Sequence, residues 1–161
     1  MRKQIAAANW KMNLSHQEAS DLLDQLVVTD HSLSAHQAAI FAVPAIYIPL
    51  AVQKLAGKHN VFVAAQNCHS KSNGAYTGEI AAAMYASVGV QHIVLGHSER
   101  REYFTESDAL LAEKEVIKNE NSIKILLNNG NEFYYSHSKQ QTEFANNDGF
   151  EFKVFLDNNS L

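Results

Sequence analysis

The sequence has little that would crosslink the chain and nothing long enough to cross a membrane. It contains one cysteine, Cys68, in 161 residues, which excludes an intrachain disulfide and fits a reducing compartment. No apolar run approaches the roughly 20 residues of a membrane span. The N-terminal segment also lacks the pattern of a signal peptide. We therefore expect a cytoplasmic protein with no membrane partner.

Charge is also sparse and unclustered. The formal net charge is −4, and no block of like charges occurs. The chain therefore has neither the basic surface of a nucleic-acid-binding protein nor an acidic tail. Hydrophobic residues make up 46% of the chain and charged residues 19%, a balance that permits a buried core. The composition predicts a soluble globular protein that does not bind nucleic acid.

Short apolar segments alternate with amphipathic ones, which is typical of βα units on a parallel sheet. The apolar segments predict strands at residues 4–10, 37–43, 60–66, 91–95 and 123–127. Capping residues and apolar stripes predict helices from Ser15, between Pro49 and Gly57, over residues 79–87 and from Thr105 onwards. Strands that are apolar on both faces need helices outside them, in a closed barrel or in an open doubly wound sheet. The pattern predicts an α/β fold and leaves both architectures open.

The composition changes after Lys118. Asparagine occurs five times in residues 1–118 and nine times in residues 119–161, while alanine falls from twenty to one. Five of the eight phenylalanines lie in this last part, and no amphipathic helix is visible there. We expect one domain over residues 1–127 and a divergent tail over residues 128–161. The tail could be a linker, a small β element near residues 150–156, or non-native sequence from a frameshift, read-through or truncation.

Polar side chains follow three of the predicted strands, at the ends where α/β folds bind ligands. They are Asn9, Lys11 and Asn13 after the first strand, Gln66 and Asn67 after the third, and His97, Ser98 and Glu99 after the fourth. A lysine and a histidine that project into the same pocket could bind an anion and polarise a carbonyl oxygen. A neighbouring Asn or Glu could orient them. This arrangement suits a small phosphorylated carbonyl substrate.

Each of these residues also has an ordinary interpretation. A lone lysine after a strand is usually a solvated surface residue, and loop histidines are common. Residues 99–102 have the pattern of a surface ion-pair cluster. Cys68 and His69 are adjacent, but the other histidines show no matching ligand spacing, so we predict no metal site.

Several strings resemble the triosephosphate isomerase family. Residues 9–13 read NWKMN and residues 96–101 read GHSERR, each after a predicted strand. Residues 66–67 read QN, residues 74–79 read GAYTGE, and residues 104–108 read FTESD. Their order and spacing agree with that family over residues 4 to about 114. The resemblance implies a (β/α)₈ (TIM) barrel, of which about four to five βα units would be present.

The resemblance also implies a chemistry and a role for each residue. The family interconverts dihydroxyacetone phosphate and glyceraldehyde 3-phosphate, in glycolysis and gluconeogenesis, without a cofactor. Lys11 would hold the substrate phosphate and stabilise the enediolate, and Asn9 would line the same pocket. His97 would be the neutral electrophile at the substrate carbonyl; this family is a known case of a histidine pKa lowered by a helix N-terminus. Glu99 would be the acid that contacts the lysine, and Ser98 would cap the helical turn.

Residues 67–79 resemble the loop that family members insert into a partner subunit. The resemblance implies a homodimer in which Tyr76, Thr77 and Gly78 lie at the interface and Thr77 lies near the partner's active site. Arg100 and Glu106 would support that geometry. An ordinary mobile surface loop is the alternative.

The catalytic base of the family is not recognisable in this sequence. The family supplies a glutamate from the end of strand six, in a Glu-Pro-Val-Trp-like string that these 161 residues do not contain. The later Gly-rich phosphate loops are missing as well. Glu132 follows NGN, which does not match the family's Gly-Glu pair, and we do not expect it to be the base.

The 161 residues are also too few for a complete barrel of this class, which needs about 250 residues. We therefore expect a truncated form with little or no activity alone. An isomerase half completed by a separate chain and a non-catalytic interaction protein are the alternatives.

Overall fold

A computed structural model describes residues 4–29, 32–116, 123–128 and 133–135 of the protein. The strands are β1 (Gln4–Asn9), β2 (Gln37–Val43), β3 (Val61–Ala65), β4 (His92–Leu95), β5 (Lys124–Asn128) and β6 (Phe133–Tyr135). The helices are α1 (His16–Val28), the 3₁₀ turn η1 (Ala45–Tyr47), α2 (Ile48–Lys54), α3 (Ala82–Ser87), α4 (Ser98–Phe104) and α5 (Asp108–Val116). All of the predicted strands are present, and their bounds shift by at most one residue at either end.

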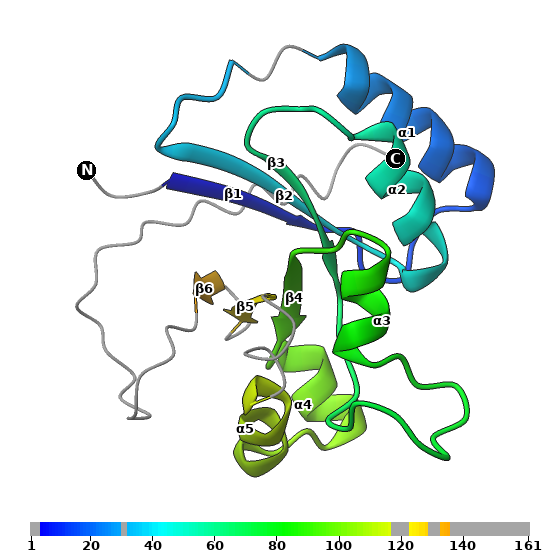
Figure 1. The fold of residues 1–161 in the computed structure, drawn as a ribbon, viewed down its shortest axis with the longest axis vertical. Coiled ribbons are helices and arrows are strands. Elements are labelled where there is room, and N and C mark those ends of the chain that lie inside the picture. Colours follow the sequence, from blue (N-terminus) through cyan, green and yellow to red (C-terminus); the bar gives the residue numbers. More distant parts are fainter. Residues whose placement is uncertain (1–3, 30–31, 117–122, 129–132, 136–161) are drawn as a thin grey trace.

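The strands form one sheet in the order β1-β2-β3-β4-β5-β6. β1 to β5 are parallel neighbours, and the sheet curls with the helices on its outer side (Figure 1). Helical crossovers that all lie on one side distinguish a barrel wall from a doubly wound sheet, which has helices on both faces. The expected partial (β/α)₈ barrel is therefore confirmed. β6 departs from this pattern, because it pairs with β5 in the antiparallel direction.

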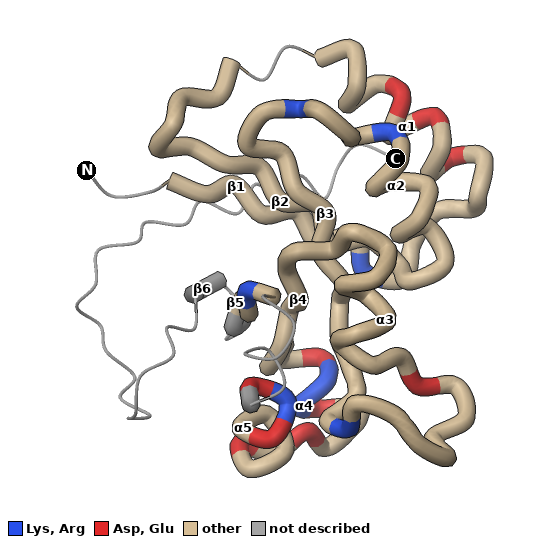
Figure 2. Tube along the Cα trace, viewed as in Figure 1, with Lys and Arg blue, Asp and Glu red and all other residues tan. Residues whose placement is uncertain are grey.

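The sheet is apolar on both faces, and the two faces build different cores. In β4, Ile93 and Leu95 pack toward the helices, whereas Val94 between them packs on the inner face. The inner cluster comes from strands alone: Ile5, Ala7, Ala38, Ile40, Ala42, Ala64, Val94 and Leu126. Successive side chains of a strand point to opposite faces of the sheet. Because both faces of a barrel wall are buried, the side chains on both faces must be apolar. β1 to β4 accordingly carry no Lys, Arg, Asp or Glu, while charges gather on α1, α4, α5 and the loops (Figure 2).

Helix α1 begins where its capping box predicts. Ser15 Oγ accepts a hydrogen bond from the Glu18 amide at 3.4 Å, and Glu18 Oε2 accepts one from the Ser15 amide at 2.7 Å. Ala19 and Leu23 are fully buried against the outer face of the sheet. An N-cap of this type contributes about 0.5–2 kcal/mol to helix stability.

Helix α3 begins at Ala82, three residues later than residues 79–87 predict. Ala81 remains extended, with φ −77° and ψ 154°, because it forms a β-bridge with His69. The His69 amide also donates to the Ile80 carbonyl at 2.9 Å. This bridge closes the base of the long loop after β3, and it overrides the helical propensity of the alanines.

The predicted tail can be compared with the structure only at its start. The expected boundary between residues 127 and 128 falls inside β5, and residues 150–156 and Glu132 lie outside the described residues. Among the described residues, no helix combines the length and apolar character needed to cross a membrane.

Candidate active site

The turn after β1 places Lys11 in an unusual backbone conformation. Lys11 has φ +53°, a left-handed region that costs a residue with a Cβ roughly 1–2 kcal/mol. Its amide donates to Asn9 Oδ1 at 2.9 Å, which makes an Asx turn. The Asn-x-Lys spacing in the sequence is therefore the signal of a tight turn that reverses the chain at the carboxyl end of β1.

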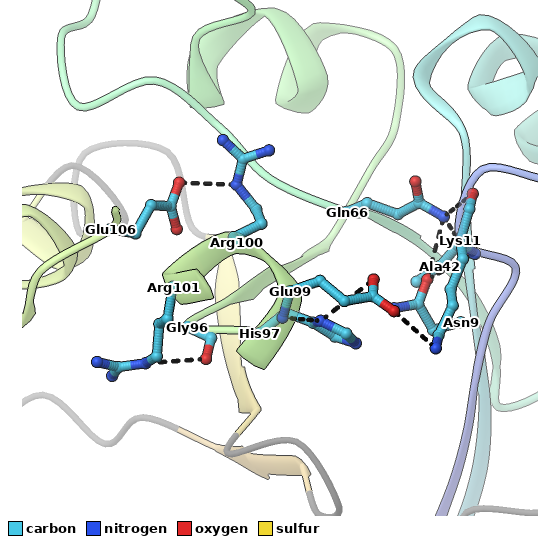
Figure 3. Close-up of polar contacts among 10 residues, drawn as sticks. All are labelled: Asn9, Lys11, Ala42, Gln66, Gly96, His97, Glu99, Arg100, Arg101 and Glu106. Carbon is cyan, nitrogen blue, oxygen red and sulfur yellow. Dashed lines mark hydrogen bonds and ion pairs between the residues drawn. The ribbon is translucent and has the colours of Figure 1, made fainter. Parts of the chain in front are cut away.

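Gln66, the first residue after β3, reaches across to this turn. Its Nε2 donates to Lys11 O at 2.9 Å, to Asn9 Oδ1 at 3.1 Å and to Ala42 O at 3.1 Å. The carboxamide thus ties together the carboxyl ends of β1, β2 and β3 (Figure 3). From the sequence, Gln66 is a polar residue at a strand end with no predicted role.

Lys11 forms an ion pair with Glu99, which comes from α4 beyond the end of β4. The distance from Lys11 Nζ to Glu99 Oε1 is 2.8 Å. The hydrogen bond from Lys11 lowers the pKa of Glu99, burial opposes this, and the charge of Lys11 and the charge that His97 carries when it is protonated lower the pKa further. The two side chains are 42% and 43% exposed, so the pair adds little to stability. Its main effect is to hold the ammonium group beside His97.

His97 is the N-cap of α4 and is only 9% exposed. Its Nδ1 accepts a hydrogen bond from the Glu99 amide at 3.2 Å, so Nδ1 carries no proton and the neutral ring carries its proton on Nε2. Burial lowers the pKa of His97; Glu99 opposes this, and Lys11 reinforces it. Glu99 Oε2 lies 3.5 Å from Nδ1, which in the neutral ring is a contact between two acceptors and not an ion pair.

The expected cap of α4 was wrong by one residue. Ser98 was predicted to cap the helical turn, but it is the first helical residue, and the cap is His97, whose backbone is extended (φ −55°, ψ 137°). An N-cap side chain must stand one residue before the helix to reach the free amides of the first turn. The imidazole of His97 therefore both caps α4 and forms part of the candidate site.

Four of the predicted site residues come together at the carboxyl ends of the strands: Asn9, Lys11, His97 and Glu99 (Figure 3). They present a cation and a neutral hydrogen-bond donor side by side. Asn9 Oδ1 already accepts two hydrogen bonds, so a contact with a ligand would come from its Nδ2. The residues predicted at a dimer interface, Tyr76, Thr77 and Gly78, lie exposed in the loop after β3.

A second charged cluster lies on the outer side of the sheet. Glu106 Oε1 accepts hydrogen bonds from Lys114 Nζ at 2.6 Å and from Arg100 Nε at 2.7 Å, and Lys114 also donates to Asn67 Oδ1 at 2.8 Å. Burial raises the pKa of Glu106, but the hydrogen bonds from Lys114 and Arg100 outweigh it and hold that pKa below its usual value. Lys114 was not predicted. The sequence feature that could have indicated its burial is its position three residues after Leu111, on the apolar stripe of α5.

A pocket of about 280 Å³ adjoins this cluster, lined in part by His69, Glu79, Arg100 and Phe104. It does not include Lys11 or His97, so its position marks the ion cluster and not the candidate active site.

The part of the chain that the structure describes contains no cluster of metal-binding side chains. No group of three or more His, Cys, Asp or Glu side chains there could hold a metal ion. Cys68 is 2% exposed, and burial raises its pKa to about 11, so the thiol stays protonated and unreactive at neutral pH.

Comparison with known proteins identifies the family. The triosephosphate isomerase family model matches residues 4–150, which continues beyond the last recognisable string and through the change in composition after Lys118. The triosephosphate isomerase of Flavobacterium psychrophilum is 37% identical over 147 residues, 91% of this chain and 58% of that protein. The Cytophaga hutchinsonii enzyme is 40% identical over 124 residues (76% and 49%), and the Clostridium beijerinckii enzyme 42% over 116 residues (71% and 45%). This chain spans about half the length of the curated relatives it matches. It belongs to the triosephosphate isomerase family.

Proposed function

We propose that this chain supplies the phosphate-binding cation and the electrophile of an isomerase that interconverts dihydroxyacetone phosphate and glyceraldehyde 3-phosphate. One observation carries the proposal: the Lys11 ammonium lies 2.8 Å from Glu99, whose amide holds His97 in the neutral form with its proton on Nε2. A cation and a neutral donor serve an anionic substrate that develops more negative charge during the reaction.

The chemistry divides between these two groups. Removal of a proton from the carbon next to the carbonyl leaves an enediolate, whose new negative charge lies on the former carbonyl oxygen. His97 Nε2–H donates a hydrogen bond to that oxygen, and Lys11 balances the charge of the phosphate and of the enediolate. Glu99 acts on the reaction through Lys11. No cofactor takes part.

The base that removes the proton is assigned to a segment outside these 161 residues, because no Glu-Pro-Val-Trp-like string occurs among them. General-base catalysis supplies about 10²–10⁴ in rate. We accordingly propose that the chain alone has little activity and acts as the N-terminal half of a barrel. The domain boundary expected between residues 127 and 128 stays a proposal; the reversal of strand direction between β5 and β6 supports a change in organisation just after it, at the end of β5.

Turnover should appear only when the missing half is supplied. We expect the 161-residue chain to show background rates in a coupled isomerase assay. Mixed with the segment of the Flavobacterium psychrophilum enzyme that follows its fifth strand, it should gain activity, and Lys11→Met should remove that activity because the phosphate loses its cation.

Lys54→Met is the matched control, since Lys54 ends α2, before the amino end of β3, and pairs with Asp24 of α1. Equal rates for Lys11→Met and the unmodified chain would reject the assignment of Lys11. A soluble, correctly assembled mixture with no turnover would favour the non-catalytic interaction protein.

We also propose a cytoplasmic homodimer. The segments that follow the carboxyl ends of the strands expose large apolar side chains: Met12 in the turn after β1 is 96% exposed, Ile46 in η1 77% and Phe104 at the end of α4 62%. They follow β1, β2 and β4, and Tyr76, 44% exposed, follows β3. Apolar side chains gathered at one end of a fold favour association, and one partner that matches this chemistry is a second copy. A single buried cysteine fits the reducing cytoplasm.

Met12→Glu should convert the dimer to a monomer in multi-angle light scattering, because it places a charge where an apolar side chain is to be buried. Val28→Glu is the control: Val28 is 84% exposed, but it lies at the far end of α1, toward the amino ends of the strands. A monomeric unmodified chain at every concentration, or monomers from both variants, would contradict the proposed interface.

A further inference from the structure

We propose that Gln66 is a positioning residue that sets the direction of the Lys11 side chain. Its consequence for catalysis rests on the proposed function, because Lys11 is the cation proposed to bind the substrate phosphate. Its structural core concerns only the turn after β1 and the carboxamide that holds it.

The carboxamide of Gln66 has more partners than a surface glutamine normally keeps. Its Nε2 lies 2.9–3.1 Å from three acceptors: Lys11 O, Asn9 Oδ1 and Ala42 O. An amide nitrogen has two hydrogens, so one of them is shared. These acceptors belong to the ends of β1 and β2, and Gln66 itself follows β3. One half-buried side chain therefore fixes three strand ends relative to one another.

The turn needs this support because Lys11 is left-handed, at φ +53°. Asn9 Oδ1 holds the Lys11 amide, but that oxygen is itself oriented by Gln66 Nε2. Gln66 also holds the Lys11 carbonyl, so it secures the peptide groups on both sides of the Lys11 Cα. Without it, the residue is free to return to a right-handed conformation, which lysine prefers.

The direction of the Cα–Cβ bond depends on this backbone conformation. In the left-handed turn, Lys11 Nζ reaches Glu99 at 2.8 Å, although Glu99 lies on α4, beyond the end of β4. A right-handed turn would point the Cβ elsewhere and separate the ammonium from Glu99 and His97. The ion pair is half exposed and too weak to impose the turn by itself.

The test measures the Lys11–Glu99 contact in the isotope-labelled 161-residue chain, by the ¹³C titration of the Glu99 carboxyl. Lys11→Met defines the pKa of Glu99 without its partner. We expect Gln66→Met, which keeps the side-chain volume and removes the donors, to raise the pKa of Glu99 by at least half of that reference shift. Gln66→Asn, whose amide is one methylene shorter, should shift it in the same direction and serves if the first variant does not fold.

Gln37→Met is the matched control. Gln37 is also half-buried, and its Nε2 donates to Gln4 Oε1 at 3.2 Å, but it lies at the amino end of β2. Substitutions of either glutamine remove more than one hydrogen bond and some stability, whereas only the Gln66 variants should move the titration of Glu99. A Glu99 titration that Lys11→Met shifts and the folded Gln66 variants leave unchanged would overturn the proposal.

A second arm connects the turn to the phosphate. Inorganic phosphate, titrated against the Lys11 side-chain signals, should bind the Gln66 variants as weakly as it binds Lys11→Met, and should bind Gln37→Met as it binds the unmodified chain. No phosphate binding by the unmodified chain would reject the proposed function of Lys11 while the Glu99 titration still decides the role of Gln66. Neither arm requires turnover.

Discussion

Replacing Glu106 with alanine is expected to lower the free energy of unfolding by about 3–5 kcal/mol. Lys114 is 4% exposed, and the change removes its carboxylate partner, so an uncompensated ammonium stays buried. Arg100 loses the same partner. Because domains of this size are stable by only about 5–15 kcal/mol, the loss should be visible as a large shift of the urea midpoint.

The double variant Glu106→Met with Lys114→Met separates a lost ion pair from lost packing. Replacing both charges with apolar side chains of similar length leaves no buried charge, so we expect most of the stability to return. Asp24→Ala, which breaks the exposed pair with Lys54, should cost about 1 kcal/mol or less. A Glu106→Ala midpoint no lower than that of Asp24→Ala would show that the buried cluster does not stabilise the fold.

The same cluster should also make the fold acid-sensitive. The pKa of Glu106 in the folded chain lies below its ordinary value of 4.5, so the unfolded chain binds more protons as the pH falls. The stabilising effect is complete above pH 4.5 and is lost as the pH falls through the folded pKa. Glu106→Gln, which cannot titrate, should flatten this part of the stability profile.

Replacing His97 with glutamine should reduce kcat of the complemented isomerase by about 10²–10³, the usual loss when one donor to a developing oxyanion is removed. KM should change less, because the hydrogen bond strengthens as charge builds on the carbonyl oxygen. The pKa of His97 lies below 6.5, and only the neutral ring has Nδ1 free to accept from Glu99. Activity should therefore persist at pH 6.5 and fall only as the pH drops through the lowered pKa.

His36→Gln is the control for this experiment, because His36 is exposed and lies before β2, at the opposite end of the sheet. Its rate should match that of the unmodified chain. Equal losses of kcat in both variants would indicate a general effect on assembly and would remove His97 from the reaction.

Local sequence patterns predicted the parts of the fold that depend on neighbouring residues. The capping box placed the start of α1, and apolar runs placed β1 to β5, because burial on both faces requires such runs. The family strings contain Asn9, Lys11, His97 and Glu99, which the fold brings together at the carboxyl ends of the strands. The start of α3 and the cap of α4 were missed, since a β-bridge to His69 and the extended backbone of His97 decided them.

The sequence by itself determined β1 to β5, most of the helices and the identity of the candidate site residues, because propensity, periodicity and short motifs act within a few residues. It did not predict β6 or η1. Tertiary structure alone decided three things. Gln66 holds the turn at Lys11 through hydrogen bonds to Asn9 and to Lys11, which precede it in the sequence by 57 and 55 positions. Lys114 is buried on an otherwise apolar stripe because Glu106 and Asn67 meet it there. The imidazole of His97 is neutral because burial and a backbone amide act on it together, and burial exists only once β4 and α4 are packed.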